Sequence, residues 1–316
     1  MRAAPRRAFA VARARAHAGR LRRRAEVAGR AVGLSPKDGI EPAIVRAEFL
    51  ALCGALARGC PELRALVTHL VARRELGNVA LALAVLTNRR DRVGLDPLWE
   101  PLGDFAHVSV DDLAGWQAPA DLAEHLGSRG VEWLAPVVRR GRPGALGETL
   151  LAAGRAWASR ASVLARGLPA GEDRAVALVE WVLLDADFDW LRRAPARLGV
   201  APEVAARATV VVAARLGATR TGALAAWREG EGPLGERLPG RWAWARAATG
   251  WDDLMVAARH ERRRACLAAL MGPPFALAVP LAIVLLKSAE LDAAALGPAD
   301  GSPARRRATA ASLLET

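Results

Sequence analysis

The spacing of apolar residues along the chain predicts helices almost throughout. From residue 44 to residue 86, apolar side chains recur every three or four positions, and the pattern breaks only around "RGCPE" (residues 58–62). The same spacing predicts further helices at residues 8–32, 119–126, 131–139, 145–167, 172–198, 204–216, 221–227, 242–248 and 252–270. Long alternation of β-branched residues is rare, so the sequence predicts an all-α protein.

The most hydrophobic stretch is "RRRACLAALMGPPFALAVPLAIVLLKSAE" (residues 262–290), whose uncharged part is long enough to cross a bilayer. Pro273 and Pro274 argue against a span, because their freed carbonyl groups would have no partner in lipid. We therefore predict two helices, the first ending near Met271 and the second covering residues 275–291. Pro280 either kinks the second helix or opens its regular part. The run "LAIVLL" (residues 281–286) predicts burial on all sides, after which Lys287 and Glu290 would give the helix a polar end.

Charge leaves a second interpretation open. The chain of 316 residues has 45 Lys and Arg against 33 Asp and Glu, a formal charge of +12, and no acidic residue precedes Glu26. Clustered positive charge is typical of nucleic-acid binding, but here it is nearly all Arg and is spread along the chain. A basic all-helical nucleic-acid-binding or scaffold protein stays as the alternative, and an integral membrane protein with one span as a less favoured one. Three cysteines without a CxxC pair fit a reduced, cytoplasmic compartment.

Motifs for catalysis are missing from the sequence. A P-loop needs a lysine after a glycine, and neither Lys37 nor Lys287 follows one. "GEGPLG" (residues 230–235) has the letters of a dinucleotide-binding turn but does not follow a buried strand, and "DADFDW" (residues 185–190) lacks the glycine and final glutamate of a calcium loop. The five histidines are isolated, so we expect surface or interface residues rather than metal ligands: His17, His69, His107, His125 and His260. The sequence predicts no enzyme, cofactor, metal or small-molecule substrate.

Three further patterns indicate structure rather than chemistry. Ser109, three residues before Asp112, predicts a capping box at a helix start. Cys53 and Cys60 are expected to be small core residues, and the ten tryptophans to pack in the core rather than to stack on bases.

The carboxy-terminal string "PPFALAVPLAIVLLKSAELDAAAL" resembles the signature of the C-type subunit family of V-type and archaeal-type ATPases, whose eukaryotic members are the d-type subunits. Three other segments resemble helices of that family in the same order: "AFAVARARAHAGRL", "RRELGNVALALAVL" and "VEWVLLDADFDWL". The residues that match the family's motifs are Arg13, Arg15, Asn78, Glu180, Asp185, Phe275, Pro280, Lys287 and Glu290. The chain departs from the family by lacking tyrosine altogether, with Phe9, Phe188 and Ile283 at the matching positions.

The resemblance implies a funnel-shaped protein of three similar helical modules, at approximately residues 1–110, 111–215 and 216–316. It implies a non-catalytic central-stalk protein, peripheral on the cytoplasmic face of the membrane. Its partners would be the shaft subunits (D/F-type) and the membrane proteolipid ring of a V/A-type ATPase or ATP synthase, and no nucleic acid.

Overall fold

A computed structural model describes residues 42–88, 99–142, 145–184, 244–245, 248, 251–273 and 275–295. These residues form helices and connecting turns, with no strand among them, which confirms the predicted all-α class. Several predicted helices lie wholly or partly outside the described residues: 8–32, 172–198, 204–216, 221–227 and 242–248.

Two long helices open the described part of the chain, α2 (Pro42–Gly59) and α3 (Pro61–Asn88). Cys60 separates them, and its N–H still donates to the Leu56 carbonyl at 2.8 Å. Pro61 begins α3, where a missing N–H costs nothing, and Glu62 places a negative charge in the first turn. The predicted break at residues 58–62 is confirmed, and its cause is this pairing of a helix end with a proline start.

The described residues fall into two compact units. Unit 1 takes those up to Thr68, Ala165–Val182 and those from Asp252 onward; unit 2 takes His69–Leu164 and the described ones in Leu183–Trp251. The division passes through α3, so one continuous helix contributes to both units. The three-module division predicted from the resemblance stays a prediction.

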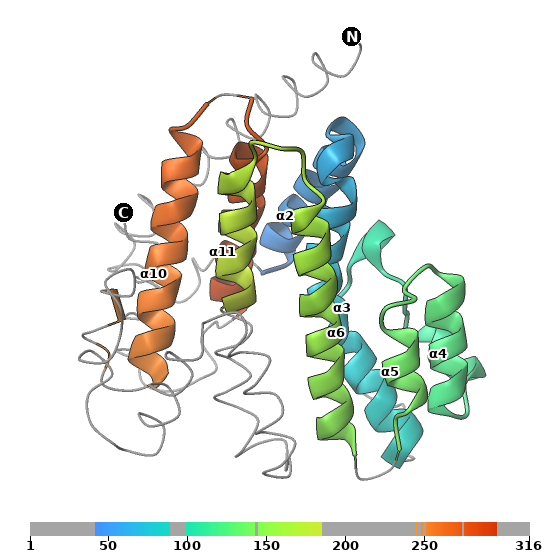
Figure 1. Cartoon of the computed structure of the whole chain (residues 1–316). Helices are drawn as coiled ribbons and strands as arrows, with labels where there is room; N and C mark the ends of the chain where they lie inside the picture. Colours follow the sequence, from blue (N-terminus) through green and yellow to red (C-terminus); the bar gives the residue numbers. More distant parts are fainter. Residues whose placement is uncertain are drawn as a thin grey trace. The chain divides into compact units, whose positions relative to one another are not determined.

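Unit 2 is built on the second half of α3. It adds η4 (Gly103–Phe105), η5 (Asp111–Gly115), α4 (Pro119–Ser128), α5 (Ala135–Arg139) and most of α6 (Leu146–Arg166) (Figure 1). Helices α4 and α5 pack against each other. One apolar cluster joins α3, η5, α4, α5 and α6, and its buried members include Val79, Leu83, Leu113, Leu122, Leu126, Leu134 and Val138.

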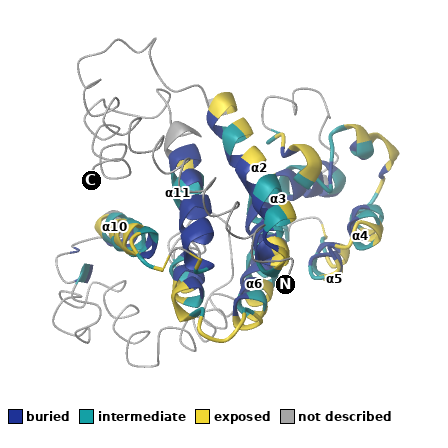
Figure 2. Ribbon diagram, turned by 90° about the horizontal axis from the view of Figure 1, so that it is seen from above, coloured by how far each residue is buried: buried dark blue, intermediate teal, exposed yellow. Residues whose placement is uncertain are grey.

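Unit 1 contains α2, most of a helix at residues 173–184, α10 (Trp251–Leu270) and α11 (Ala278–Ala295). Helix α11 packs against α2 and most of its residues are buried, as the largely dark blue ribbon of α11 in Figure 2 shows. Leu281, Ala282 and Ile283 have no exposed surface. The two-helix prediction for residues 262–290 is therefore confirmed, with the second helix starting at Ala278, three residues later than expected.

Pro280 lies in the first turn of α11, where the helix needs no backbone donor, so it opens the helix instead of kinking it. Among the described residues, no helix combines the length and the apolar character that crossing a bilayer requires.

Candidate functional site

A buried lysine on α11, Lys287, links this helix to α2 in unit 1. The ammonium of Lys287 donates to Glu48 Oε2 at 2.8 Å and to Glu290 Oε2 at 2.6 Å. The Lys287 side chain has no exposed surface, Glu290 keeps 4% and Glu48 keeps 25%. We call these three residues the Lys287 cluster. The expectation of a polar helix end at this point was wrong: α11 continues to Ala295, and the charges lie inside the protein because they neutralise one another.

Helix geometry explains why Lys287 meets Glu290, whereas the contact with Glu48 depends on the packing of α11 against α2. Lys287 and Glu290 are three residues apart on α11, so they lie on the same face. The face turns towards α2, where Glu48 lies between the buried residues Val45 and Phe49 and so projects at the edge of the contact. A buried ammonium is tolerated only when carboxylates and hydrogen bonds replace its water. The cluster therefore links α11 to α2 through paired charges.

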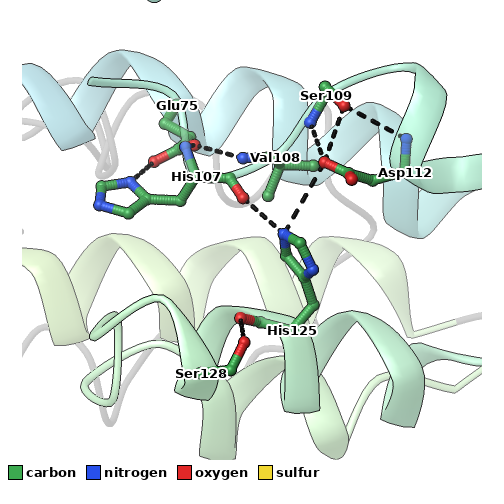
Figure 3. A network of polar contacts seen from close by, with 7 residues as sticks. All are labelled: Glu75, His107, Val108, Ser109, Asp112, His125 and Ser128. Carbon is green, nitrogen blue, oxygen red and sulfur yellow. Dashed lines mark hydrogen bonds and ion pairs between the residues drawn. The ribbon is translucent and has the colours of Figure 1, made fainter. Parts of the chain in front are cut away.

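A second polar network lies in unit 2 around the buried carboxylate of Glu75 (Figure 3). Its Oε1 accepts the backbone N–H groups of His107 and of Val108, the latter at 2.9 Å. Its Oε2 accepts Nδ1–H of His107 at 2.6 Å. One carboxylate on α3 thus replaces the missing backbone partners of the segment that leads into η5.

The network continues through His125 on α4. Its Nε2–H donates to the carbonyl of His107 at 2.7 Å and lies 3.7 Å from Asp112 Oδ2 (Figure 3). Asp112 Oδ2 in turn accepts the backbone N–H and the hydroxyl of Ser109, at 2.9 and 2.7 Å, while the Asp112 N–H donates to Ser109 Oγ at 3.2 Å. The reciprocal hydrogen bonds of the predicted capping box are present, but the element that follows, η5, is a short 3-10 helix whose N-cap residue is Val110 rather than Ser109.

These contacts change the acidity of Asp112. Partial burial raises its pKa, but the hydrogen bonds from Ser109 and the positive charges of His125 and Arg129 lower it more, so the net pKa lies below the ordinary value. Asp112 therefore stays ionised as an acceptor.

The prediction for His69 was wrong, because this histidine is a core residue. Its Nε2 is 2.8 Å from the carbonyl of Trp157, and Trp157 Nε1 donates to the carbonyl of His69, also at 2.8 Å. The two rings stack at 5.7 Å, and Trp133 meets His69 edge-on at 4.9 Å. Burial lowers the pKa of His69, as does the charge of Arg160, while the bond to Trp157 opposes them. The pair ties α3 to α6 and confirms Trp157 as a core residue.

Asn78, one of the residues that match the family motif, is buried on α3. Its Nδ2 donates to the Glu100 carbonyl and its Oδ1 accepts the Glu100 N–H, both at 2.8 Å. Arg74, one turn earlier on α3, forms an ion pair with the Glu100 side chain at 2.5 Å. The Asn78 amide therefore replaces the backbone hydrogen-bond partners that Glu100 lacks and holds this residue against α3.

The other predicted site residues do not join one site. Pro280 is buried, Glu180 is exposed, and Phe275 is 58% exposed in the turn before α11. Arg13, Arg15 and Asp185 lie outside the described residues.

Sequence reasoning missed Glu75, His107 and His125 as a network. A signal was present, because Glu75 falls between Ala72 and Val79 on the buried stripe of α3, where an acid needs a partner. The sequence did not indicate which partner, since His107 is far from Glu75 along the chain.

The described residues contain no group of three or more His, Cys, Asp or Glu side chains able to bind a metal ion. The thiols of Cys53, Cys60 and Cys266 are buried and outside any disulfide, and burial was predicted for Cys53 and Cys60. Burial raises the pKa of Cys53, and raises that of Cys266 to about 12, so neither is poised to act as a thiolate.

Comparison with known proteins finds no matching family model, curated protein or solved structure.

Proposed function

We propose that this chain is a non-catalytic central-stalk (rotor) component of a V/A-type ATPase or ATP synthase, equivalent to the C-type or d-type subunits. It would couple the central shaft to the membrane proteolipid ring during proton or sodium transport. In this role it would form the funnel of three helical modules that the resemblance implies, and it would work without a cofactor or a small-molecule substrate.

The observation that carries the proposal is the burial of four motif residues: Asn78, Pro280, Lys287 and Glu290. Three of them form specific polar contacts, and Lys287 bonds to a residue 239 positions away in the sequence. Two of the four segments that resemble the family, within residues 73–86 and 273–296, thus contribute buried residues to unit 2 and unit 1. A subunit that transmits torque needs contacts between distant segments, because such contacts oppose local unfolding of either segment.

Co-production with the shaft and ring subunits tests the proposal. We expect the tagged chain to co-purify with both, and we expect the enzyme reconstituted with it to couple ATP hydrolysis to ion uptake into vesicles. The enzyme assembled without the chain should hydrolyse ATP without transport. The proposal fails if the partners assemble into a transporting enzyme without the chain while the chain elutes alone.

Two controls make the result specific. Leu285→Asp, which places a charge in the core of α11, should abolish co-purification by unfolding unit 1. Glu180→Ala, at an exposed position, should leave the fold unchanged and reports whether that motif residue contacts a partner. Binding of the free chain to RNA or DNA with steep salt dependence, in place of complex formation, would favour the nucleic-acid alternative.

A further inference from the structure

Unit 1 carries an exposed apolar tip at the turn that joins α10 to α11, at one end of both helices (Figure 1). Met271 is 88% exposed, Phe275 58% and Leu267 40%. Three exposed residues on the last turns of α10, Arg264, Leu267 and Ala268, and the exposed Met271 just after the helix form one stripe that runs to the tip, because Leu267 and Ala268 each lie three or four residues from both Arg264 and Met271. Large apolar side chains exposed together indicate an interaction surface.

Positive charge lies beside this tip. No acidic residue occurs in residues 262–289, which begin with three consecutive arginines. Arg264 keeps 76% of its side chain exposed while its Nη1 lies 2.8 Å from Glu261. Arg174 also reaches the turn, since a Cβ added to Gly272 would be 2.6 Å from its Nη1.

Two acidic side chains at this end of unit 1 already have partners within the protein. Glu172 Oε2 accepts the N–H of Leu277 at 2.8 Å, and Glu261 pairs with Arg264. Asp173, beside Arg174 in the sequence, is exposed. The stripe itself, from Arg264 to Phe275, carries positive charge and apolar side chains and no acid.

We propose that the surface formed by Arg264, Leu267, Met271 and Phe275 docks on the headgroup layer of an anionic lipid bilayer. The spacing fits: Arg264 and Met271 are seven residues apart, about 10 Å along a helix. Apolar groups of interfacial helices enter the headgroup boundary by about 5 to 10 Å. With Met271 and Phe275 at that depth, Arg264 lies at the level of the lipid phosphates, to which a guanidinium donates in bidentate fashion.

This inference goes beyond the proposed function and does not require it, because a bilayer surface without any protein partner is enough for its test. Met271 and Phe275 lie in the turn and are largely exposed, which suits insertion between headgroups. A net charge of +12 on the whole chain further favours an anionic surface over a neutral one.

Vesicle co-sedimentation of the purified full chain tests the inference. Vesicles of phosphatidylcholine with phosphatidylglycerol are compared with vesicles of phosphatidylcholine alone. We expect clear binding to the anionic vesicles, and a loss of at least about tenfold in the variant M271S/F275S, which removes most of the apolar area at the tip. Arg264→Gln should weaken binding to the anionic vesicles several-fold and leave binding to the neutral ones unchanged.

Matched controls come from other exposed apolar residues. Ile44 and Val163 are 50% and 47% exposed on α2 and α6, so I44S/V163S also removes exposed apolar surface, though less than M271S/F275S does, and should bind as the parent chain does. Thermal melts establish that each variant is folded, and Met271→Ser alone, at the most exposed position, replaces the double variant if that one melts early.

Three results would overturn the inference. They are no binding of the parent chain to anionic vesicles, equal binding by M271S/F275S, and an equal loss in I44S/V163S. If M271S/F275S instead loses co-purification with the shaft or ring subunits while still binding vesicles, the tip is a protein interface and the lipid assignment is wrong. Failure of vesicle binding with intact complex assembly would reject this inference and leave the proposed function standing.

Discussion

Replacing Lys287 by methionine tests the Lys287 cluster as the main polar joint of unit 1. At an effective dielectric constant of about 20, each contact of about 2.7 Å contributes roughly 6 kcal/mol of gross Coulomb attraction. Desolvation of the ions takes back several kcal/mol for each of them. Measured losses for breaking such buried pairs by removing one partner are about 3 to 5 kcal/mol, and we expect Lys287→Met to lower the free energy of unfolding by that amount.

The matched control is Arg264→Met. Arg264 and Glu261 form an ion pair at 2.8 Å with the same three-residue spacing as Lys287 and Glu290, but the arginine is 76% exposed. An exposed pair contributes less than about 1 kcal/mol, so this variant should be almost as stable as the parent chain.

A triple variant separates charge from packing. E48Q/K287M/E290Q removes both carboxylates together with the ammonium, so none of the three charges of the Lys287 cluster remains. It should recover a large part of the stability lost in Lys287→Met, because much of that loss comes from leaving carboxylates in the interior.

The assay is urea denaturation followed by far-ultraviolet circular dichroism, with free energies extrapolated linearly to water. Equal free energies of unfolding for Lys287→Met and Arg264→Met would refute the reasoning, since burial is what distinguishes the two pairs. A triple variant less stable than Lys287→Met would refute the assignment of the loss to buried charge.

Three further predictions concern single residues. Leu285→Asp should lower the free energy of unfolding by several kcal/mol in the same urea assay, whereas Ala268→Asp on the exposed face of α10 should not. Equal free energies of unfolding for the two variants would mean that α11 is not part of the core. His69 has a folded-state pKa below its ordinary 6.5, so the unfolded chain binds more protons and stability falls as pH drops below about 6.5; His69→Phe should flatten this part of the pH profile of thermal melting. Asp112 has a folded-state pKa below its ordinary 3.8, so its contribution is complete above that value and is lost as pH falls through the folded pKa; Asp112→Asn should remove this acid limb, and an unchanged limb would contradict the role of the Ser109 hydrogen bonds.

Local signals in the sequence predicted where the chain breaks between helices, but not every helix start: α11 begins three residues later than expected, and of the helix predicted over residues 131–139 only Ala135–Arg139 is helical. Proline and glycine act on their own backbone, so the break before Pro61 and the separation of α10 from α11 could be derived from neighbouring residues alone. The capping box of Ser109 and Asp112 was predictable for the same reason, since both partners lie within four residues.

Contacts between distant segments could not be predicted in this way. The spacing of Lys287 and Glu290 places them on one face of a helix, but nothing local indicates that Glu48 completes the pair or that the face is buried. Likewise, the isolation of His69 along the chain suggested a surface residue, whereas Trp157 on α6 and Trp133 in the turn before α5 contact its ring. Packing decides such environments, and a single sequence does not encode packing in any short pattern.

The Lys287 cluster also sets an order of events during synthesis. Glu48 leaves the ribosome more than two hundred residues before Lys287, and the described parts of unit 1 come from three separate stretches of the chain. Contacts of such sequence separation form slowly, because a long loop must close first. The segments around Glu75 and His107 emerge earlier and close a much shorter loop. We therefore expect His69–Leu164 of the nascent chain to resist protease before α11 is available to pack against α2. Until translation has passed α11, the apolar face of α2 stays exposed and is a binding surface for chaperones.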